Sequence, residues 1–381
     1  MAQILFVTWD GGGNVPPALA LARELQRRGH VVRFLGHPRQ RADLEAAGFD
    51  VVRTRYTRAF SSLTEHSTPD LLAAFTDRGM GRDLLEAVTT RQPDLVVVDC
   101  LLFGALDAAR RSGTPYVVLE HFYDGYYESG CLRSPMALVA RARRLRPGRA
   151  VAGAAGRLVL AHPELDRPGR RGRAPEVRHV GPVVPPRRPA EPPSAPCVLV
   201  SLSTFAFRGM AACLQRIVDA AAAVAPEVVV TTGPAVDPAE LRHPAHVRVH
   251  RYVEHATLMP RATAFVGHGG HGSTMQALVH DLPMALLPQD SRTDQPTVAR
   301  SIEEAGAGVV LDRKAGTDVV AGTLARLLGD GSYREAAARV GAAVRAMPGA
   351  VLGADAVEQL LLAERRPGAR SRDSGAGPLS G

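Results

Sequence analysis

The chain has 381 residues, 45% hydrophobic and 22% charged, a composition typical of a soluble globular protein with room for two domains. We find no apolar run of about 18 residues and no basic region before the first apolar segment, so we expect neither a membrane span nor a signal peptide. The net charge of +8 leaves nucleic-acid binding open, but a solvated arginine-rich surface or an anionic small substrate explains it better.

The first half of the chain alternates short apolar runs with longer helical patterns. Residues 17–29 have helical spacing and end at Gly29, a residue typical of helix C-termini. Because the apolar runs contain few polar residues, we predict buried parallel strands covered by helices, an α/β fold. Strands are predicted at 4–9, 30–36, 94–100 and 116–121, and further helices at 83–92 and 105–113.

A proline-rich segment separates this half from a second one of the same kind. Residues 181–196 contain seven prolines and no apolar periodicity, which is typical of an interdomain linker. The site is then expected in the cleft between the halves. We also expect the amphipathic residues 356–366 to pack across the domain junction. The predicted units are an N-terminal domain at 1–181, a linker at 182–196, a C-terminal domain at 197–366 and a disordered tail at 367–381, and strands of the second half are predicted at 197–203, 228–233, 247–253, 264–268, 284–288 and 308–311.

The stretch AFVGHGGHGSTMQAL, residues 264–278, has the order of a strand, a glycine loop and a helix. Glycines let the backbone approach a ligand, and Ser273 or Thr274 can cap the helix. The N–H groups and dipole of a helix N-terminus favour phosphate, to which His268 could donate a hydrogen bond. A glycine-rich turn with a structural histidine is the alternative.

Two further stretches qualify this interpretation. Asp294 and Gln295, just before Pro296, combine a carboxylate and an amide, which suit sugar hydroxyls, although such residues also form turns. In WDGGGNVPP, Gly11 and Gly13 are followed by Pro16 where a dinucleotide-binding loop needs a third glycine. This argues against a Rossmann dehydrogenase.

Residues 252–295 resemble the nucleotide-sugar signature of the two-domain GT-B glycosyltransferases that act on small lipophilic acceptors, including plant secondary-product and actinomycete antibiotic enzymes. The resemblance extends to 9–36 and to 201–204, and it implies two Rossmann-like domains facing each other across a cleft. Gln276 departs from the family's usual glutamate at the ribose, and Asp281 from its usual glycine. The implied donor-binding residues are Tyr252 at the base, His268, Gly270, Ser273, Thr274, Ser203 and Thr204 at the phosphates, Gln276 at the ribose, and Asp294 and Gln295 at the sugar.

Asn14 stands where this family usually carries a histidine, or sometimes an aspartate, that takes the proton from the acceptor. An amide cannot do so, and general-base catalysis contributes about 10²–10⁴-fold. Three explanations stay open: Asp99 or His121 acts as the base while Asn14 orients the acceptor, the acceptor needs little help, or the chain only binds. Asp99 aligns with the aspartate that partners the family histidine, or it caps the next helix; His121 and Glu120 end a predicted strand and are expected to face the cleft.

The acceptor side is expected to be aromatic. The segment 121–130, HFYDGYYESG, concentrates aromatic residues that suit a flat aglycone, or that form a hydrophobic patch beneath a loop. Residues 54–80 lack a clear period and are interpreted as a variable acceptor loop. The expected acceptor-binding residues are Asp10, Phe122, Tyr123, Tyr126 and Tyr127.

We therefore expect an inverting, metal-independent glycosyltransferase that moves a sugar from a TDP- or UDP-sugar to a small aromatic or polyketide-like natural product, with no cofactor. The alternatives are a MurG-like cell-wall transferase or a sugar epimerase on the same fold, and a non-catalytic nucleotide-sugar-binding partner of another transferase. The four cysteines form no CxxC pair and show no metal-ligand spacing, which favours a reducing, cytoplasmic location. We expect small-molecule ligands and no nucleic acid, and a homodimer is compatible with the sequence.

Overall fold

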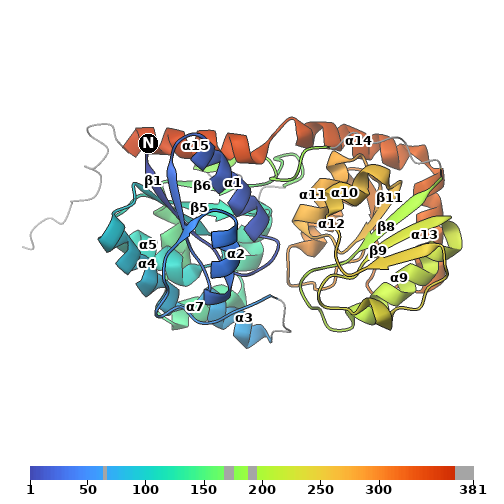
Figure 1. Cartoon of the computed structure of the whole chain (residues 1–381), viewed down its shortest axis with the longest axis horizontal. Helices are drawn as coiled ribbons and strands as arrows, with labels where there is room; N and C mark the ends of the chain where they lie inside the picture. Colours follow the sequence, from blue (N-terminus) through green and yellow to red (C-terminus); the bar gives the residue numbers. More distant parts are fainter. Residues whose placement is uncertain (63–66, 167–175, 188–194, 365–381) are drawn as a thin grey trace, which may run out of the picture.

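The computed structural model describes residues 1–62, 67–166, 176–187 and 195–364. Two α/β domains lie side by side, each built on a parallel sheet with helices on both faces (Figure 1). The predicted fold class is confirmed. The predicted tail at 367–381 and part of the predicted linker, 188–194, lie outside the described residues.

The first domain contains a seven-stranded parallel sheet in the order β3-β2-β1-β4-β5-β6-β7. Its central strands β4 and β5 are buried at every position, as expected for strands covered by helices on both faces. The predictions missed β3, β6 and β7, which are only two to four residues long. The strands are β1 (Gln3–Val7), β2 (Val31–Leu35), β3 (Asp50–Val51), β4 (Leu95–Asp99), β5 (Tyr116–Glu120), β6 (Gly156–Val159) and β7 (Val177–His179).

Helices connect these strands and cover the sheet. The region predicted as a variable acceptor loop, 54–80, contains one whole helix, whose N-terminus is capped by Ser67. The helices are α1 (Val15–Arg27), α2 (Arg41–Ala46), α3 (Thr68–Phe75), α4 (Arg78–Arg91), α5 (Phe103–Ser112), α6 (Asp124–Tyr126), α7 (Pro135–Ala142) and α8 (Pro147–Ala152), with a 3₁₀ turn at Pro38–Gln40 and a π-helical segment at Tyr127–Leu132.

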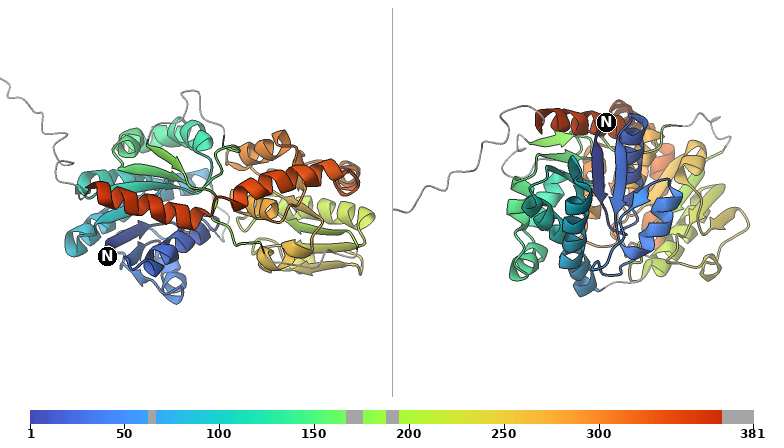
Figure 2. Two further views of the ribbon diagram at one scale, coloured as in Figure 1. Left: turned by 90° about the horizontal axis from the view of Figure 1, so that it is seen from above. Right: turned by 60° about the vertical axis from the view of Figure 1, so that its left-hand side comes forward.

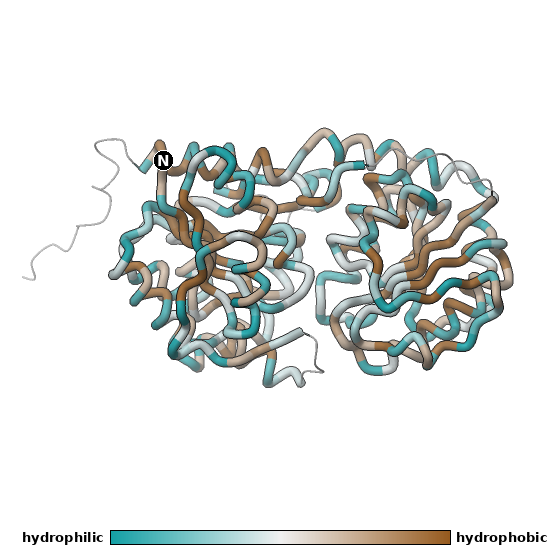
Figure 3. Tube along the Cα trace, viewed as in Figure 1, coloured by the Kyte–Doolittle hydropathy of each residue, from teal (hydrophilic) through white to brown (hydrophobic). Residues whose placement is uncertain are grey.

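The second domain contains a six-stranded parallel sheet in the order β10-β9-β8-β11-β12-β13. Apolar residues follow its strands through the interior (Figure 3). The strands are β8 (Cys197–Ser201), β9 (Glu227–Thr231), β10 (Val247–His250), β11 (Ala264–Gly267), β12 (Met284–Leu286) and β13 (Gly308–Val310). The helices are α9 (Met210–Val224), α10 (His255–Leu258), α11 (His271–Val279), α12 (Gln295–Glu304), α13 (Thr317–Gly329) and α14 (Gly331–Arg345), with 3₁₀ turns at Pro238–Glu240 and Met259–Arg261.

The last helix, α15 (Gly349–Glu364), returns to the first domain, so that α14 and α15 run along one side of both domains (Figure 2). Val357 and Leu360 belong to the hydrophobic cluster of the first sheet and α1. Arg28 on α1 lies 2.6 Å from Asp355 and 2.8 Å from Glu358. The chain therefore crosses the domain junction as predicted. The residues of α15 fall in the range predicted for the C-terminal domain, but the helix packs on the N-terminal domain.

By length and composition alone, the stretch Gly331–Glu364 resembles a membrane span. It divides into α14 and α15, which are separated by Pro348. Buried residues of α14, such as Val344, pack within the second domain, whereas those of α15 pack within the first. These contacts explain the apolar composition as that of helices packed on two domains.

Candidate active site

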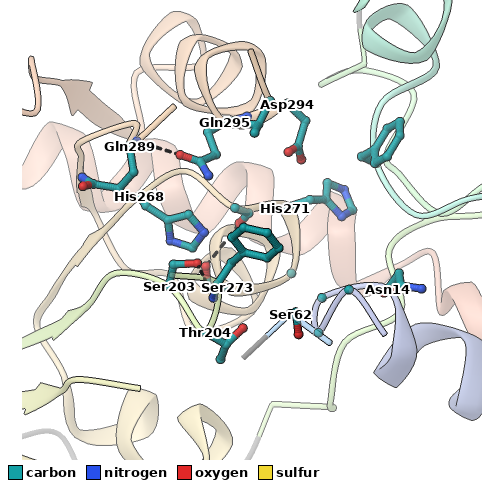
Figure 4. Close-up of a pocket in the computed structure, with 18 of the residues that line it drawn as sticks. Asn14, Ser62, Ser203, Thr204, His268, His271, Ser273, Gln289, Asp294 and Gln295 are labelled. Carbon is teal, nitrogen blue, oxygen red and sulfur yellow. Dashed lines mark hydrogen bonds between the residues drawn. The ribbon is translucent and has the colours of Figure 1, made fainter. Parts of the chain in front are cut away.

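A deep cleft separates the two domains and is lined by loops that follow the carboxyl ends of strands in both sheets (Figure 4). Its volume is about 2120 Å³. Pockets for one small molecule usually measure about 300–1,000 Å³. The cleft therefore has room for two substrates at once, one held by each domain.

The glycine loop after β11 forms one wall of the cleft. Residue Gly270 is the extended N-cap of α11, and a Cβ there would lie 2.3 Å from His268 Nε2, so only glycine fits beside this histidine. Burial, reinforced by neighbouring His255, lowers the pKa of His268 to about 4. Neutral His268 and the first turn of α11 thus face the cleft where the sequence predicts phosphate binding.

The other predicted phosphate residues divide into two groups. Ser203, Thr204 and Ser273 line the cleft (Figure 4). Thr274 does not, because its side chain is fully buried inside the domain. The predicted contact of Thr274 with phosphate is therefore wrong. Its side chain packs in the core, whereas Ser273, one residue earlier on α11, lines the cleft.

Asp294 and Gln295 begin α12 and point toward the same part of the cleft (Figure 4). Gln295 Oε1 accepts a hydrogen bond of 2.7 Å from the backbone N–H of Gln289, which leaves its NH₂ group for a ligand. Burial in the cleft raises the pKa of Asp294 to about 6, against the opposing effect of nearby His121. The pair offers an amide donor and a carboxylate acceptor side by side.

The remaining predicted donor residues lie toward the outer end of the cleft. Tyr252 is 70% exposed at its rim, where a ring can stack on a flat base from outside. Gln276 on α11 is nearly buried but still lines the wall. Both side chains therefore line the cleft, and their contacts with the base and the ribose stay predictions.

The opposite wall brings together Asn14, Asp99 and His121 from three separate loops. The Asn14 Nδ2 group donates to Asp99 Oδ2 at 3.1 Å, to the Trp9 carbonyl at 3.0 Å and to Thr8 Oγ1 at 3.1 Å. Asp99 Oδ1 accepts from the backbone N–H of Leu101 at 3.0 Å, so Asp99 also holds the turn before α5. The Asn14 amide group is a fixed part of this wall, and Asp99 itself is buried beneath it.

His121 lines the cleft on this wall, as does the carboxylate of Asp10, and its imidazole is a candidate proton acceptor. Its Nδ1 lies 3.1 Å from Asp99 Oδ2, although the two atoms do not form a hydrogen bond in the present ring orientation. With Nδ1 turned toward a carboxylate, Nε2 is the free nitrogen. A histidine oriented by a buried aspartate is an arrangement suited to general-base chemistry.

The same corner contains three side chains that could in principle hold a metal ion. Ligand atoms of Asp99, Cys100 and His121 lie within 4.8 Å of one another. Burial, and then the Asp99 charge, raises the pKa of the Cys100 thiol well above its usual range. Asp99 already accepts two hydrogen bonds in this corner, from Asn14 Nδ2 and from the Leu101 N–H, and transfer without a metal ion stays a prediction.

Glu120, predicted to face the cleft with His121, points the other way. It is fully buried and accepts a 2.7 Å hydrogen bond from Arg157 Nε. Arg157 also pairs with Asp124, on the far side of His121. Successive residues of a strand point to opposite faces, which explains why only one of the two reaches the cleft.

The aromatic segment after β5 also divides. Phe122 and Tyr126 line the cleft, as predicted. Tyr123 and Tyr127 are fully buried: the hydroxyl of Tyr123 lies 2.9 Å from Ser301 Oγ, and that of Tyr127 donates to the Cys100 carbonyl at 2.8 Å. Their predicted acceptor-binding role is corrected to a packing role, because the short helical turns here place these two rings inward.

Several lining residues were not predicted. Trp9 and Phe75 pack edge to face, 4.9 Å apart, in the acceptor wall beside predicted Asp10. The lone tryptophan directly after the first strand was the available signal. His271, the second histidine of the glycine loop, also lines the cleft. The wall is therefore more aromatic than the segment 121–130 alone suggests.

Two facing parallel-sheet domains, with a glycine loop at a helix N-terminus on one side of the cleft, define the GT-B architecture of glycosyltransferases. Residues 12–201 match the family described as "Glycosyl transferase 4-like domain" and residues 215–360 match "Erythromycin biosynthesis protein CIII-like, C-terminal domain". The chain belongs to the GT-B glycosyltransferases of the actinomycete antibiotic type, and it is a glycosyltransferase.

Relatives and solved structures extend this assignment over nearly the whole chain. The chain is 28% identical to 4'-demethylrebeccamycin synthase of Lentzea aerocolonigenes, over 82% of this chain and 88% of the relative. It is 27% identical to demethyllactenocin mycarosyltransferase of Streptomyces fradiae, over 95% and 87% respectively. The crystal structure of CalG4, the calicheamicin glycosyltransferase, superposes with a TM-score of 0.76 at 25% identity, covering 96% of this chain and 100% of that one.

Proposed function

We propose that this chain transfers a sugar from a TDP- or UDP-sugar to a small aromatic or polyketide-like natural product, with inversion at the anomeric carbon and without a metal ion. The observation that carries the proposal is the position of the His121–Asp99 pair, which faces the donor residue Asp294 across the cleft. Two structural neighbours with thymidine diphosphate in their descriptions, VinC and SpnG, share the fold at 24% and 20% identity, which favours trying this nucleotide first.

On the acceptor side, His121 replaces the base that Asn14 cannot supply. The acceptor's hydroxyl proton moves to His121 Nε2, and buried Asp99 stabilises the imidazolium that forms. The acceptor oxygen then bonds to the anomeric carbon from the face opposite the leaving diphosphate. A single displacement of this kind inverts the configuration, and the electrons of the broken bond go to the diphosphate.

On the donor side, the chain itself supplies the groups that stabilise the diphosphate. The N-terminus of α11, the Ser203 hydroxyl and His268 face the cleft as potential donors, and the Ser273 hydroxyl, which donates to the Gly270 carbonyl at 3.2 Å, can turn to the diphosphate. Such preorganised dipoles act on the charge that develops on the leaving group, which is the basis for proposing metal-independent transfer.

The acceptor class follows from the wall around His121. Trp9, Phe75, Phe122 and Tyr126 surround the entrance to this base with flat apolar rings. Large aromatic side chains stack on planar ligands and exclude water from them. A planar aglycone fits this wall better than a lipid-linked cell-wall intermediate. The four buried, unpaired cysteines agree with a reducing cytoplasmic setting.

The test separates binding from turnover. Thermal unfolding is first measured with TDP, UDP, GDP and NAD; a ligand at about 100 times its Kd adds about 2.7 kcal/mol of stability. We expect stabilisation by TDP or UDP and none by NAD. TDP-glucose and UDP-glucose are then offered with a panel of planar phenols. Stabilisation without any product would instead support a non-catalytic binding partner, for which Asn14 is the single favourable residue.

A further inference from the structure

Asp281 follows α11 in a backbone conformation that favours glycine. Its φ is +57°, and its N–H donates to the Leu278 carbonyl at 2.9 Å. The N–H of Leu282 donates to the Ala277 carbonyl at 3.0 Å, which completes a Schellman turn with Asp281 as its left-handed residue. Glycine fits such a position without strain, whereas an L-amino acid there is less stable by about 1–2 kcal/mol. The aspartate side chain therefore has to make contacts that offset this cost.

The Asp281 carboxylate binds two arginines from distant parts of the chain. Its Oδ1 accepts a hydrogen bond from Arg345 Nη1 at 2.7 Å, and its Oδ2 accepts one from Arg187 Nη1. Arg345 ends α14 and also donates to the Val279 carbonyl at 2.8 Å. For Arg187, the residues that the structure describes provide no second hydrogen bond or ion pair. The Asp281 side chain is only 15% exposed, so water screens these pairs less than it screens surface ion pairs.

These two arginines belong to the two segments that cross between the domains. Residues 182–187 leave the first domain, and residues 345–348 lead from α14 back to α15 (Figure 1). The two backbones touch, because a Cβ at Gly181 would lie 2.2 Å from the Met347 carbonyl oxygen and a Cβ at Gly349 would lie 2.3 Å from the Gly181 carbonyl oxygen. Both crossings therefore pass the domain border side by side, and Asp281 ties each of them to the second domain.

The first crossing also forms part of the cleft, which is lined by Val183, Val184 and Pro185. Val183 packs against the hydrophobic cluster of the first sheet, whereas Val184 packs against the cluster that includes β11 and β12 of the second sheet. The border between the domains therefore falls between these two valines. Arg187 fixes the chain three residues beyond Val184, so the stretch that can bend at the border is short.

We propose that Asp281 is a positioning residue for sugar transfer, which holds both crossings to the second domain and so confines the hinge to the border between Val183 and Val184 and at Gly349. Hinges are short segments that absorb the rotation between two rigid bodies. A short hinge restricts the orientations in which the donor wall can meet the acceptor wall, and a closed cleft excludes water. Without the Asp281 carboxylate, both crossings are released and the domains sample more orientations. This role concerns the frame of the cleft and goes beyond the proposed function, which names the substrates.

Substitutions at three positions separate this role from that of a turn residue. Asp281→Gly supplies the residue that the turn favours and removes the carboxylate, so the free energy of unfolding should stay within about 1 kcal/mol of wild type. Asp281→Asn tolerates the same backbone conformation and keeps a neutral acceptor oxygen. Arg187→Ala releases the first crossing from an exposed position. Arg339→Ala is the matched control, because Arg339 lies on α14 but donates to the Ala305 carbonyl within the second domain.

Small-angle X-ray scattering and steady-state kinetics give the readouts. Without ligand, we expect Asp281→Gly and Arg187→Ala to show a larger radius of gyration and a broader distance distribution than the wild type. With TDP-glucose and a phenol acceptor, both variants should lower kcat/KM about 3- to 10-fold and raise the fraction of donor lost to hydrolysis, whereas the Kd for TDP should change less than about 2-fold. Asp281→Asn should fall between these variants and the wild type, and Arg339→Ala should behave as the wild type. The double variant should resemble Asp281→Gly alone, because the two residues act through one contact.

Asp281→Gly with the scattering of the wild type, or with unchanged kcat/KM, overturns the inference and makes Asp281 a turn residue only. Additive losses in the double variant also overturn it, because Arg187 and Asp281 would then act independently. A wild-type protein that transfers no sugar overturns the proposed function instead. The scattering comparison needs no substrate, so it still decides whether Asp281 holds the hinge.

Discussion

The two walls of the cleft are built in different ways. The donor wall comes from nearby stretches of chain, since His268 and Gln295 lie within 28 residues of each other and both follow strands of one sheet. The acceptor wall gathers Asn14, Asp99 and His121 from three loops spread over more than 100 residues. Because the residues of the donor wall are close in sequence, they form a motif that can be recognised there. In the acceptor wall, a functional group missing from one loop can be supplied by the loop after a neighbouring strand.

That exchange explains how the acceptor wall keeps a base without a histidine at position 14. Strands β1, β4 and β5 are neighbours in the first sheet, so the loops after them meet at one edge. Asp99, the last residue of β4, is within reach of both the loop after β1 and the loop after β5. Asp99 can therefore orient a side chain from the loop after β1 or from the loop after β5. In this chain the histidine, His121, comes from the loop after β5.

The largest effect is expected from His121→Ala. Loss of the base should lower kcat by about 10²–10⁴-fold and leave the Kd for TDP within about 2-fold, because donor binding lies on the other wall. The measurements are single-turnover transfer and titration calorimetry. Adding Asn14→His to this variant should restore part of kcat, since position 14 already contacts Asp99.

A different result would move the base to another residue. If His121→Ala retained full turnover while Asp99→Ala lost it, Asp99 would be the working base and His121 would only line the wall. Comparing acidic with weakly acidic phenols sharpens this test, because an acceptor that is already ionised should be transferred almost as well by His121→Ala as by the wild type.

A pH effect on the affinity for the donor is expected from Asp294 on the donor wall. Asp294 accepts a sugar hydroxyl best as a carboxylate, and its pKa is raised from 3.8 to about 6, so protonation removes that acceptor as the pH falls through 6. At pH 5 the affinity for TDP-glucose, whose diphosphate keeps its charge over this range, should be about 10-fold lower than at pH 8; free TDP is a separate comparison, because its terminal phosphate gains a proton near pH 6. Titration calorimetry over this range measures both. Asp294→Asn should abolish the difference; a pH dependence that survives in this variant would mean that another group controls the affinity for the donor.

At Gly12 the two walls lie so close together that an added side chain would disturb their contact. This glycine has φ +73°, and a Cβ there would lie 3.1 Å from Thr204 Oγ1 in the donor domain. Gly12→Ala should destabilise the protein by about 1 kcal/mol and lower kcat/KM further by hindering the approach of the domains. Chemical denaturation and steady-state kinetics measure the two effects. Gly13→Ala is the matched control, because a Cβ there meets nothing within 4 Å and both values should stay near wild type.

The sequence predicted the fold well where the pattern is local. Alternating apolar runs predicted the long strands and the two-domain order, but β6 and β7 are three or four residues long and include charged Arg157 and Arg178. The position of α15 was not predictable in full, because amphipathicity shows that a helix packs without showing on which domain. Its contacts with α1 join residues more than 320 positions apart.

The site shows the same difference between local sequence patterns, which were predictable, and contacts between distant residues, which were not. His268, Asp294 and Gln295 follow a local motif and line the cleft, and their contacts with the donor stay predictions. Side-chain direction was the weaker part: Thr274 is turned into the core by the helix period, and the hydroxyls of Tyr123 and Tyr127 bind groups that only tertiary structure brings near. His271 lies in the same glycine loop, but only the structure shows that it lines the cleft and packs against Tyr123.

The smallest effect is expected from Tyr126→Phe. The matched variant is Tyr127→Phe, at the next tyrosine of the same segment. The Tyr126 hydroxyl donates to the Arg292 carbonyl of the donor domain at 2.7 Å, whereas the Tyr127 hydroxyl bonds within its own domain. Each Phe variant loses one hydrogen bond, about 0.5–1.5 kcal/mol. Because the Tyr126 bond joins the domains beside Asp294, its loss should lower kcat/KM about 2- to 10-fold with little change in stability. Tyr127→Phe should show the reverse, a lower free energy of unfolding with nearly unchanged kcat/KM. Identical behaviour of the two variants in denaturation and kinetics would mean that the Tyr126 contact does not help to close the cleft.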